Sequence, residues 1–315
     1  MSKIAFIYPG QGAQKAGMGA DFYENSEIAR YIFDQAGEEL DLDMKELCFE
    51  ENDRLDLTEY TQAAMVTTCL AMTRVAESKG LKADITAGLS LGEYPAIAAA
   101  GGMNDMDAIR LVRKRGILMQ NTVPAGEGAM CTVISMAAEE IEKVIEPIAD
   151  VSVANYNCPG QIVITGKTDA VEEAAAKLKE AGARRTIMLN VSGPFHSQML
   201  VPAGEKLAEE LEHTRFHELR IPYVTNVTAE KVTDIRETPG LLTTQISSPV
   251  RWMQSMERMI ADGVDTFVEI GPGKTLEGFL RKIDRSVKVF HISQWEDVDK
   301  VCTELADSGK MMEEA

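Results

Sequence analysis

The segment Gly88-Leu89-Ser90-Leu91-Gly92 fits the pattern G-x-S-x-G, which can present a serine nucleophile. It stands between a short apolar segment and a run of small residues, so we expect a sharp turn from a strand into a helix. In that context the Ser90 hydroxyl projects at the helix N-terminus, and the Leu91 N–H is placed to stabilise an oxyanion. Because small residues meet the pattern by chance, a plain glycine-rich helix start is the alternative.

A serine nucleophile needs a base, and the chain contains four histidines. His213 and His217 stand at positions i and i+4 on a charged helix end, where a solvated face is expected and no third metal ligand is suggested. His291 lies within an apolar strand, where a structural role is the ordinary expectation. His196 belongs to a Gly-Pro-Phe-His turn ahead of a helix, a place where catalytic side chains are presented. We predict His196 as the base; a turn histidine without a role is the alternative.

The most informative charged residue is Arg115. On the helix expected from 105 to about 121, it falls on the apolar stripe that contains Leu111, Val112 and Met119. A guanidinium directed into a protein interior needs an anion as its partner. That partner can be a substrate carboxylate held by the guanidinium fork, or an internal Asp or Glu. The spacing alone leaves both possibilities open.

The elements that must position these residues alternate between strands and helices. Strands are expected at 3–8, 84–88, 221–225, 266–270 and 287–292, and helices at 28–40, 61–79, 91–100, 105–121, 202–212 and 250–262. Between 126 and 190 the order is strand, helix, strand, strand, helix, strand, the ferredoxin-like split unit. We therefore predict an α/β fold with a large α/β-hydrolase-like domain (1–125 and 191–315), built on a parallel sheet, and an inserted small ferredoxin-like (βαββαβ) domain (126–190).

The composition limits the classes of function. The 315 residues carry a formal net charge of −18, so nucleic acid, which needs a basic protein face, is not expected as a partner. The five cysteines are scattered without a C-x-x-C pair, which indicates reduced thiols and no zinc framework. The chain start lacks a signal-peptide core, and no stretch is long and apolar enough to span a membrane. We expect a cytoplasmic monomer.

Several motifs coincide along the chain and together resemble one family. They are, in order, Pro9-Gly10-Gln11-Gly12-Ala13-Gln14, Gly88-Leu89-Ser90-Leu91-Gly92-Glu93-Tyr94, Arg115-Gly116, Asn155-Tyr156-Asn157-Cys158-Pro159-Gly160-Gln161, Gly193-Pro194-Phe195-His196 and Gly271-Pro272-Gly273. As a set they resemble the malonyl-CoA:acyl-carrier-protein transacylases of type II fatty acid synthesis. The resemblance extends over nearly the whole chain, to about residue 290.

The resemblance implies a role for each matching position. Ser90 is similar to the acylated nucleophile of the family, and His196 to its general base and acid. The backbone N–H groups of Gln11 and Leu91 match the family's oxyanion hole. Arg115 matches the arginine that binds the malonyl carboxylate. The resemblance therefore implies that the anion bound by Arg115 is the substrate carboxylate and not an internal Asp or Glu.

Further positions match residues around that centre. Gln245 corresponds to the residue whose backbone carbonyl orients the histidine, so no triad aspartate is needed. Met119 and Phe195 match acyl-pocket residues, and a phenylalanine just before the histidine is similar to the malonyl-selective members. Leu89 is a departure, because the family more often has His before the serine.

The implied reaction passes a malonyl group from coenzyme A to the phosphopantetheine thiol of acyl carrier protein through a malonyl-serine ester, and supplies fatty acid synthesis. The coenzyme A thioester is then a substrate, and no metal or redox cofactor is expected. The family's carrier protein is acidic. Two basic clusters are candidates for contacting it, each with a solvated helix face as the alternative: Lys177, Lys179, Arg184 and Arg185, or Arg281, Lys282 and Arg285.

Three other functions remain open at this point. A serine esterase predicts an acidic triad member between Ser90 and His196, where the split unit fits badly. A non-catalytic carrier-docking subunit predicts loss of the nucleophile or base, and both are present. A free-standing polyketide acyltransferase with a different extender unit is hardly separable from fatty acid synthesis by sequence.

Overall fold

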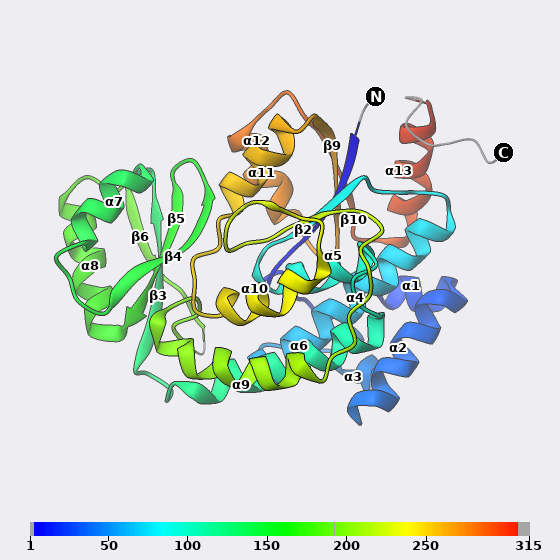
Figure 1. The fold of residues 1–315 in the computed structure, drawn as a ribbon, viewed down its shortest axis with the longest axis horizontal. Coiled ribbons are helices and arrows are strands. Elements are labelled where there is room, and N and C mark those ends of the chain that lie inside the picture. Colours follow the sequence, from blue (N-terminus) through cyan, green and yellow to red (C-terminus); the bar gives the residue numbers. More distant parts are fainter. Residues whose placement is uncertain (1–2, 192, 308–315) are drawn as a thin grey trace.

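The computed structural model describes residues 3–191 and 193–307, which form two β-sheets with helices packed against them (Figure 1). The larger sheet has the strand order β10-β9-β1-β2-β7-β8, and every neighbouring pair is parallel except β7 and β8. Its strands are β1 (Lys3–Tyr8), β2 (Ile85–Gly88), β7 (Tyr223–Val224), β8 (Lys231–Val232), β9 (Val264–Ile270) and β10 (Lys288–Ile292). The predicted α/β fold with a mainly parallel sheet is confirmed.

Strand β1 lies inside the large sheet and is buried on both faces. Successive side chains of a strand point to opposite sides. Phe6 and Tyr8 therefore join one apolar core, and Ala5 and Ile7 join a second core on the other side of the sheet. This two-sided burial explains why β1 is an almost uninterrupted apolar run.

Helices cover both faces of this sheet. They are α1 (Ala20–Asn25), α2 (Glu27–Leu40), α3 (Met44–Phe49), α4 (Thr58–Ser78), α5 (Glu93–Ala99), α6 (Asp105–Thr122), α9 (Val201–Glu212), α10 (Thr238–Gln245), α11 (Trp252–Ala261), α12 (Thr275–Ile283) and α13 (Trp295–Asp307). Helix α4 is buried along most of its length and packs against α6 and α2. Among the described residues, no helix is long and apolar enough to cross a membrane.

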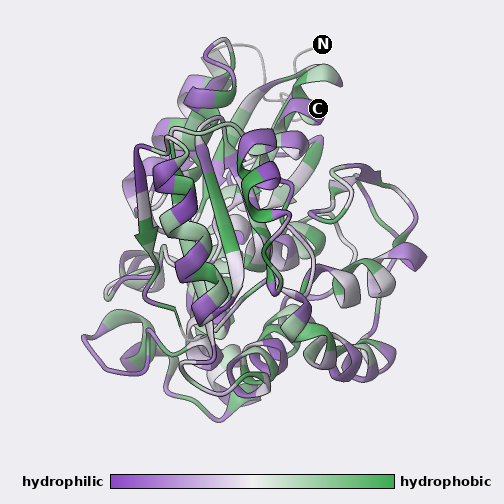
Figure 2. Cartoon of the chain, turned by 90° about the vertical axis from the view of Figure 1, so that its left-hand side faces the viewer, coloured by the Kyte–Doolittle hydropathy of each residue, from purple (hydrophilic) through white to green (hydrophobic). Residues whose placement is uncertain are grey.

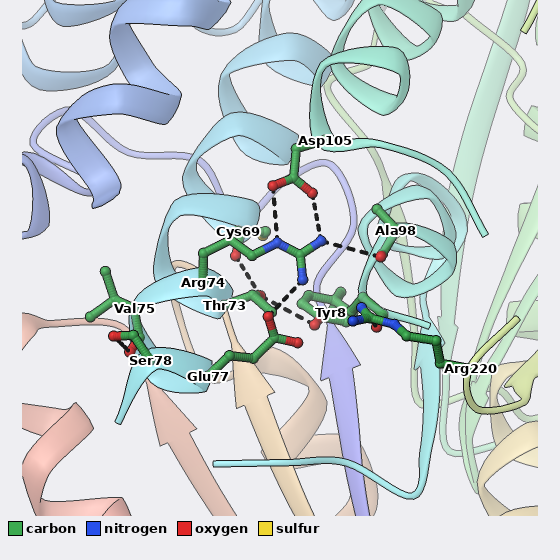
Figure 3. A network of polar contacts seen from close by, with 11 residues as sticks. Tyr8, Cys69, Thr73, Arg74, Val75, Glu77, Ser78, Ala98, Asp105 and Arg220 are labelled. Carbon is green, nitrogen blue, oxygen red and sulfur yellow. Dashed lines mark hydrogen bonds and ion pairs between the residues drawn. The ribbon is translucent and has the colours of Figure 1, made fainter. Parts of the chain in front are cut away.

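Arg74 of α4 connects three of these helices (Figure 3). Its Nε donates to Asp105 Oδ2 at 2.9 Å and its Nη2 to Asp105 Oδ1 at 2.6 Å, at the first residue of α6. Its Nη1 donates to Glu77 Oε2 at 2.6 Å, and Nη2 also reaches the carbonyl of Ala98 in α5 at 3.2 Å. This cluster fixes α5 and α6, which follow Ser90 and carry Arg115 respectively, against α4.

The smaller sheet is antiparallel, with the order β4-β5-β3-β6. Its elements are β3 (Gly128–Ile134), α7 (Ala138–Ile145), β4 (Val151–Cys158), β5 (Gln161–Lys167), α8 (Thr168–Glu180) and β6 (Arg185–Met188). This is the order of elements expected between 126 and 190. In Figure 2, which views the chain from the side of α7 and α8, the nearby helices show alternating hydrophilic and hydrophobic bands, as amphipathic helices over a sheet should.

The two faces of the small sheet meet different surroundings. Cys131 and Val133 of β3 pack under α7 and α8 in a core of their own. Met130 and Val163, on the opposite face, belong to the core shared with the large sheet. The division into two domains at residues 125 and 191 stays a prediction, and its residues 1–2, 192 and 308–315 lie outside the described part of the chain.

Several elements were not expected from the sequence, among them α12 and α13. Helix α12 follows Gly271-Pro272-Gly273, a segment that indicates the end of the preceding strand. Its N-terminus is capped by a side chain of that strand, because the Glu269 carboxylate accepts the N–H groups of Leu276 at 3.1 Å and Glu277 at 2.8 Å. A cap supplied from the preceding strand leaves no spacing signal at the helix start. Strand β7 is also shorter than the 221–225 expected.

Candidate active site

Ser90 lies at the sharp turn between β2 and α5 that the G-x-S-x-G pattern predicts. Its φ is 52°, in the left-handed region that is strained for a non-glycine residue. The turn has no space for side chains at its glycines. A Cβ at Gly88 would lie 1.9 Å from the Gly92 carbonyl carbon, and a Cβ at Gly92 would lie 2.2 Å from the Tyr8 carbonyl oxygen. The glycine spacing therefore reflects two close backbone approaches.

His196 lies beside Ser90, with 2.7 Å between Ser90 Oγ and His196 Nε2. Its other ring nitrogen, Nδ1, faces two backbone carbonyls, Gln245 O at 2.9 Å and Ser248 O at 3.1 Å. A carbonyl only accepts, so Nδ1 carries the proton and Nε2 is free to accept from the serine hydroxyl. Burial, and after it the charge of Arg115, lowers the pKa of His196 to about 4, which keeps the ring neutral at neutral pH.

The turn that contains His196 is fixed by hydrogen bonds of the next residue, Ser197. Ser197 Oγ donates to the Pro194 carbonyl at 2.7 Å and accepts from the Met199 N–H at 3.2 Å. His196 itself has a φ of 61°, so both members of the Ser–His pair are held in the left-handed region. Strain of this kind persists only where the surrounding structure over-determines it.

Arg115 is 1% exposed, and its guanidinium lies beside the serine. Nη2 donates to Ser90 Oγ at 3.2 Å and to Gln245 Oε1 at 3.1 Å, and Nη1 donates to Gln62 Oε1 at 2.9 Å. Its carbon lies 5.4 Å from the centre of the Tyr94 ring. Among the described residues no carboxylate forms a direct ion pair with it, although the buried Glu93 acts on it electrostatically without direct contact, and burial lowers its pKa. This arrangement removes the internal ion pair as the explanation of the buried charge.

Gln245 connects these three residues. Its backbone carbonyl accepts from His196, as predicted, while its side-chain oxygen accepts from Arg115. Its side-chain nitrogen donates to the Ser90 carbonyl at 2.9 Å and to Glu93 Oε2 at 2.8 Å. One residue at the end of α10 therefore contacts the serine, the histidine and the arginine.

Sequence reasoning missed three polar residues of this centre. Gln62 accepts from Arg115, Glu93 accepts from Gln245, and Asn226 Oδ1 accepts from the Ser90 N–H at 2.6 Å. Gln62 left a sequence signal, because it directly precedes the apolar run from Ala63 to Val66, and the structure buries it fully. Glu93 is part of the motif from Gly88 to Tyr94, which gives it no role of its own, and Asn226 left no signal, since their partners are far apart in the sequence.

A cavity of about 720 Å³ opens above Ser90 and His196. Of the other predicted site residues, Gln11, Leu91, Arg115, Met119 and Phe195 line it, and Gln245 does not. Leu89 lines it too, at the position where the resembling family more often has His. Its remaining wall includes Thr132, Asn155 and Asn157 from the small sheet and Phe279 from α12, so both sheets contribute to one site.

The other three histidines do not line this cavity. His291 Nδ1 lies 3.6 Å from Glu277 Oε2, and His213 follows the last residue of α9. Within the described residues, no group of three or more His, Cys, Asp and Glu side chains could hold a metal ion. The predicted basic residues Lys177 and Arg281 form ion pairs on their own helices, with Glu173 and Glu277.

A serine on a strand–helix elbow, hydrogen-bonded to a neutral histidine at the base of a cavity, defines the class of serine acyl-transfer enzymes. Comparison with known proteins agrees with this class, since a family model for the acyl transferase domain matches residues 5–298. The malonyl CoA-acyl carrier protein transacylase of Bacillus subtilis (strain 168) is 44% identical over 304 residues, which cover 95% of this chain and 96% of that protein.

Solved structures give the same result. The malonyl CoA-acyl carrier protein transacylase of Clostridium perfringens has a TM-score of 0.94 at 42% identity and covers 98% of both chains. A chain from a complex of a type II PKS acyl-carrier protein with its malonyl-transacylase has a TM-score of 0.93 at 35% identity, over 96% of this chain and 100% of that one. The chain belongs to the acyl transferase domain family and, within it, to the malonyl CoA-acyl carrier protein transacylases.

Proposed function

We propose that this enzyme transfers a malonyl group from coenzyme A to the phosphopantetheine thiol of acyl carrier protein through an ester on Ser90, and so supplies fatty acid synthesis. One observation supports this most strongly. Among the described residues Arg115 is a buried cation that forms no ion pair with a carboxylate, and its Nη2 lies 3.2 Å from the nucleophilic Ser90 oxygen. An acyl group that ends in a carboxylate provides the missing anion. An acetyl group does not.

In the first half-reaction Ser90 Oγ attacks the thioester carbonyl while His196 Nε2 takes the hydroxyl proton. The resulting oxyanion lies against the backbone N–H groups of Gln11 and Leu91. When the tetrahedral intermediate collapses, the carbon–sulfur bond breaks and His196 returns the proton to the departing coenzyme A thiolate. The malonyl ester of Ser90 remains, with its free carboxylate on Arg115.

The second half-reaction is the reverse with another thiol. The phosphopantetheine thiol gives its proton to His196 and attacks the ester, and Ser90 leaves as the alcohol after His196 protonates it. One thioester is exchanged for another, so the chemistry needs no metal or redox cofactor. An esterase is not favoured, because His196 Nδ1 faces two backbone carbonyls where that class predicts an acidic side chain. A polyketide enzyme with another extender unit is not favoured either, since the relatives are named malonyl transacylases.

Phe195 and Met119 are the residues that we propose for acyl selectivity. Phe195 is 6% exposed, Met119 is 2% exposed, and both line the cavity. The Met119 sulfur is also held, because Gln62 Nε2 donates to it at 3.3 Å. Phe195→Ala should admit a branched methylmalonyl group that the wild type excludes. Equal methylmalonyl loading by both proteins would contradict this role.

For the carrier protein we propose a surface that joins parts of the two predicted basic clusters. Ile134 of β3 pairs with Gln161 on one side and with Arg185 on the other, so these residues form one row across the small sheet. Gln161 lines the cavity and accepts from Lys282 Nζ at 3.4 Å. Arg185 and Lys282 therefore flank the same end of the sheet at the cavity. Both are exposed and can meet an acidic partner.

The double charge reversal Arg185→Glu, Lys282→Glu should slow transfer from the Ser90 ester to the carrier several-fold at low salt, and less at high salt. The matched control is Lys177→Glu, Lys179→Glu on α8, which keeps the number of reversed charges. Equal effects of the two double variants would show that net charge matters and the proposed surface does not. A monomeric state and a cytoplasmic location also stay predictions.

Intact-protein mass spectrometry tests the main proposal. Brief mixing with malonyl-CoA should add one malonyl group to the wild type and none to Ser90→Ala, and the carrier protein bearing a free phosphopantetheine thiol should remove it. Parallel samples with acetyl-CoA and methylmalonyl-CoA give the acyl preference. No adduct from any of the three thioesters would contradict the proposed function.

A further inference from the structure

Glu93 is a fully buried carboxylate outside the cavity wall, three residues after Ser90. It is the first residue of α5 and therefore belongs to the same turn as the nucleophile. Its Oε2 accepts two hydrogen bonds, from Gln245 Nε2 at 2.8 Å and from the Asn226 N–H at 3.0 Å. A buried carboxylate is costly, so its retention beside a reactive centre needs an explanation. Its two partners supply one.

The first partner, Gln245, has a side-chain amide whose direction matters. Its nitrogen lies between two acceptors, the Glu93 carboxylate and the Ser90 carbonyl. Because the nitrogen is held there, the amide oxygen is the end that faces the Arg115 guanidinium. A reversed amide would present N–H groups to a cation and leave the arginine with one neutral acceptor fewer. Glu93 thus selects the amide orientation that holds Arg115.

The second partner, Asn226, holds the nucleophile turn. Its side-chain oxygen accepts from the Ser90 N–H at 2.6 Å, and its side-chain nitrogen donates to the Gly88 carbonyl at 2.7 Å. The backbone N–H of the same residue is the group that donates to Glu93. The strained Ser90 backbone is therefore braced by a residue that Glu93 itself anchors.

We propose that Glu93 is a positioning residue that acts through Gln245 and Asn226, and that it fixes the malonyl-binding Arg115 and the Ser90–His196 pair as one unit. It touches neither the substrate nor the reacting atoms. The inference rests on the proposed function, because it assigns Glu93 to the part of the site that distinguishes a carboxylated acyl group from an acetyl group. A merely structural carboxylate would affect both acyl groups alike.

A second buried glutamate provides the matched control. Glu269 is also fully buried, and burial raises the pKa of each of these two carboxyls to about 7. Like Glu93, it accepts two N–H groups, but these belong to the start of α12. No hydrogen bond connects Glu269 to His196, Arg115 or Gln245 in the described part of the chain. Replacing each glutamate by methionine removes the same chemistry at two places.

The experiment measures single-turnover acylation of Ser90 by malonyl-CoA and by acetyl-CoA, using rapid quenching and intact-protein mass spectrometry. Four proteins are compared with the wild type: Glu93→Met, Glu93→Gln, Gln245→Met and Glu269→Met. Nitrogen NMR of His196 reports in parallel whether the proton stays on Nδ1. The tautomer and the malonyl-to-acetyl rate ratio are readouts that loss of stability alone does not move.

We expect Glu93→Met to slow malonyl transfer roughly a hundredfold, because small misplacements of reacting groups cost about that much. Its malonyl-to-acetyl ratio should fall several-fold, and His196 should lose its single tautomer. Glu93→Gln keeps an oxygen that can accept from the same two donors and should restore the ratio. Glu269→Met should keep the wild-type ratio whatever its stability.

Gln245→Met keeps the proposal testable if Glu93→Met does not fold. It leaves the carboxylate and its bond from Asn226 in place and removes its connection to Arg115, together with the hydrogen bond to the Ser90 carbonyl, so the ratio must fall here too. An unchanged ratio in Glu93→Met or Gln245→Met, or an equal fall in Glu269→Met, overturns the role of Glu93. A wild type that gains no malonyl ester would instead contradict the proposed function.

Discussion

Two arginines at different points of the α4–α6 helix pair are both largely buried and differ in their partners. Arg74 meets both oxygens of Asp105 and one oxygen of Glu77, and this anionic environment raises its pKa (Figure 3). Arg115, ten residues after Asp105 on α6, meets the neutral oxygens of Gln62, Gln245 and Ser90, and burial lowers its pKa.

The difference separates a structural charge from a charge that is available to a ligand. A cation whose carboxylates come from the chain itself is already compensated, so it holds helices together. A cation whose hydrogen bonds all go to neutral oxygens has no counter-charge in direct contact, which is unfavourable until an anion arrives. For Arg115 the buried Glu93 acts only without direct contact. The α4–α6 pair thus carries two kinds of charge. Arg74 is neutralised by Asp105 and Glu77, whereas Arg115 at the active site is left without an ion-pair partner among the residues that the structure describes.

The largest effect should come from Arg115→Met. It removes the buried partner of the malonyl carboxylate, so malonyl transfer should fall roughly a thousandfold, whereas acetyl loading should rise or stay the same. Acylation rates with the two thioesters measure this. Equal losses with both substrates would mean that Arg115 does not act as a carboxylate clamp. Arg74→Met, the matched variant on α4, should keep the wild-type preference for malonyl.

The same two variants should behave in the opposite way in unfolding experiments. Arg74→Met leaves Asp105 and Glu77 without their shared cation and should lower the free energy of unfolding by about 3 kcal/mol. Arg115→Met removes a buried charge that no direct ion pair compensates and should leave the stability unchanged or higher. Urea denaturation followed by circular dichroism gives both values. A larger loss for Arg115→Met would reverse the comparison.

Binding of malonyl-CoA should supply the counter-charge of Arg115 and so stabilise the folded protein. In a Ser90→Ala background, which cannot be acylated, malonyl-CoA at a hundredfold excess over its Kd should stabilise the protein by about 2.7 kcal/mol. Thermal unfolding shows this stabilisation as a rise in the melting temperature. Adding Arg74→Met should preserve the rise, and adding Arg115→Met should abolish most of it. The same gain with acetyl-CoA would show that coenzyme A, and not the carboxylate, provides the stabilisation.

The smallest effect concerns the pH profile. The pKa of His196 is lowered to about 4, so the base is neutral above that value and is lost only as the pH falls through it. The acylation rate should therefore decline near pH 4, well below the ordinary histidine value of about 6.5. Because the Arg115 charge contributes to this lowering, Arg115→Met should move the acidic decline upward in acetyl loading. Protonation of His196 near pH 6.5 in the wild type, followed by nitrogen NMR of the ring, would contradict the buried, neutral histidine.

Much of the site could be predicted because its signals are local. The G-x-S-x-G pattern depends on two close backbone approaches, one within the turn from Gly88 to Gly92 and one from Gly92 to Tyr8 of β1. Because the chain has only four histidines, His196 could be identified by elimination. Arg115 could be identified because it falls on the apolar stripe of its helix. The spacing could not say which anion Arg115 binds, and the structure removes the internal ion pair.

The rest depended on contacts between distant segments. Gln245 followed only from the family resemblance, since it contacts Ser90, Arg115 and His196 from far along the chain. Asn226 lies 136 residues from the Ser90 N–H that it accepts. Glu269 caps α12 from the strand before it, so the Gly-Pro-Gly segment at the start of this helix carries no capping residue that would predict it. Common polar residues in loops carry no spacing signal for such roles.

The most direct test of this account is a crystal structure of Ser90→Ala with malonyl-CoA bound. We predict that the malonyl carboxylate lies within hydrogen-bond distance of both terminal nitrogens of Arg115, while Gln62 and Gln245 keep their contacts with it and the thioester carbon lies beside residue 90. A malonyl carboxylate that points to solvent, or to a different cation, would contradict the claim that the substrate forms the ion pair that Arg115 lacks in the free protein.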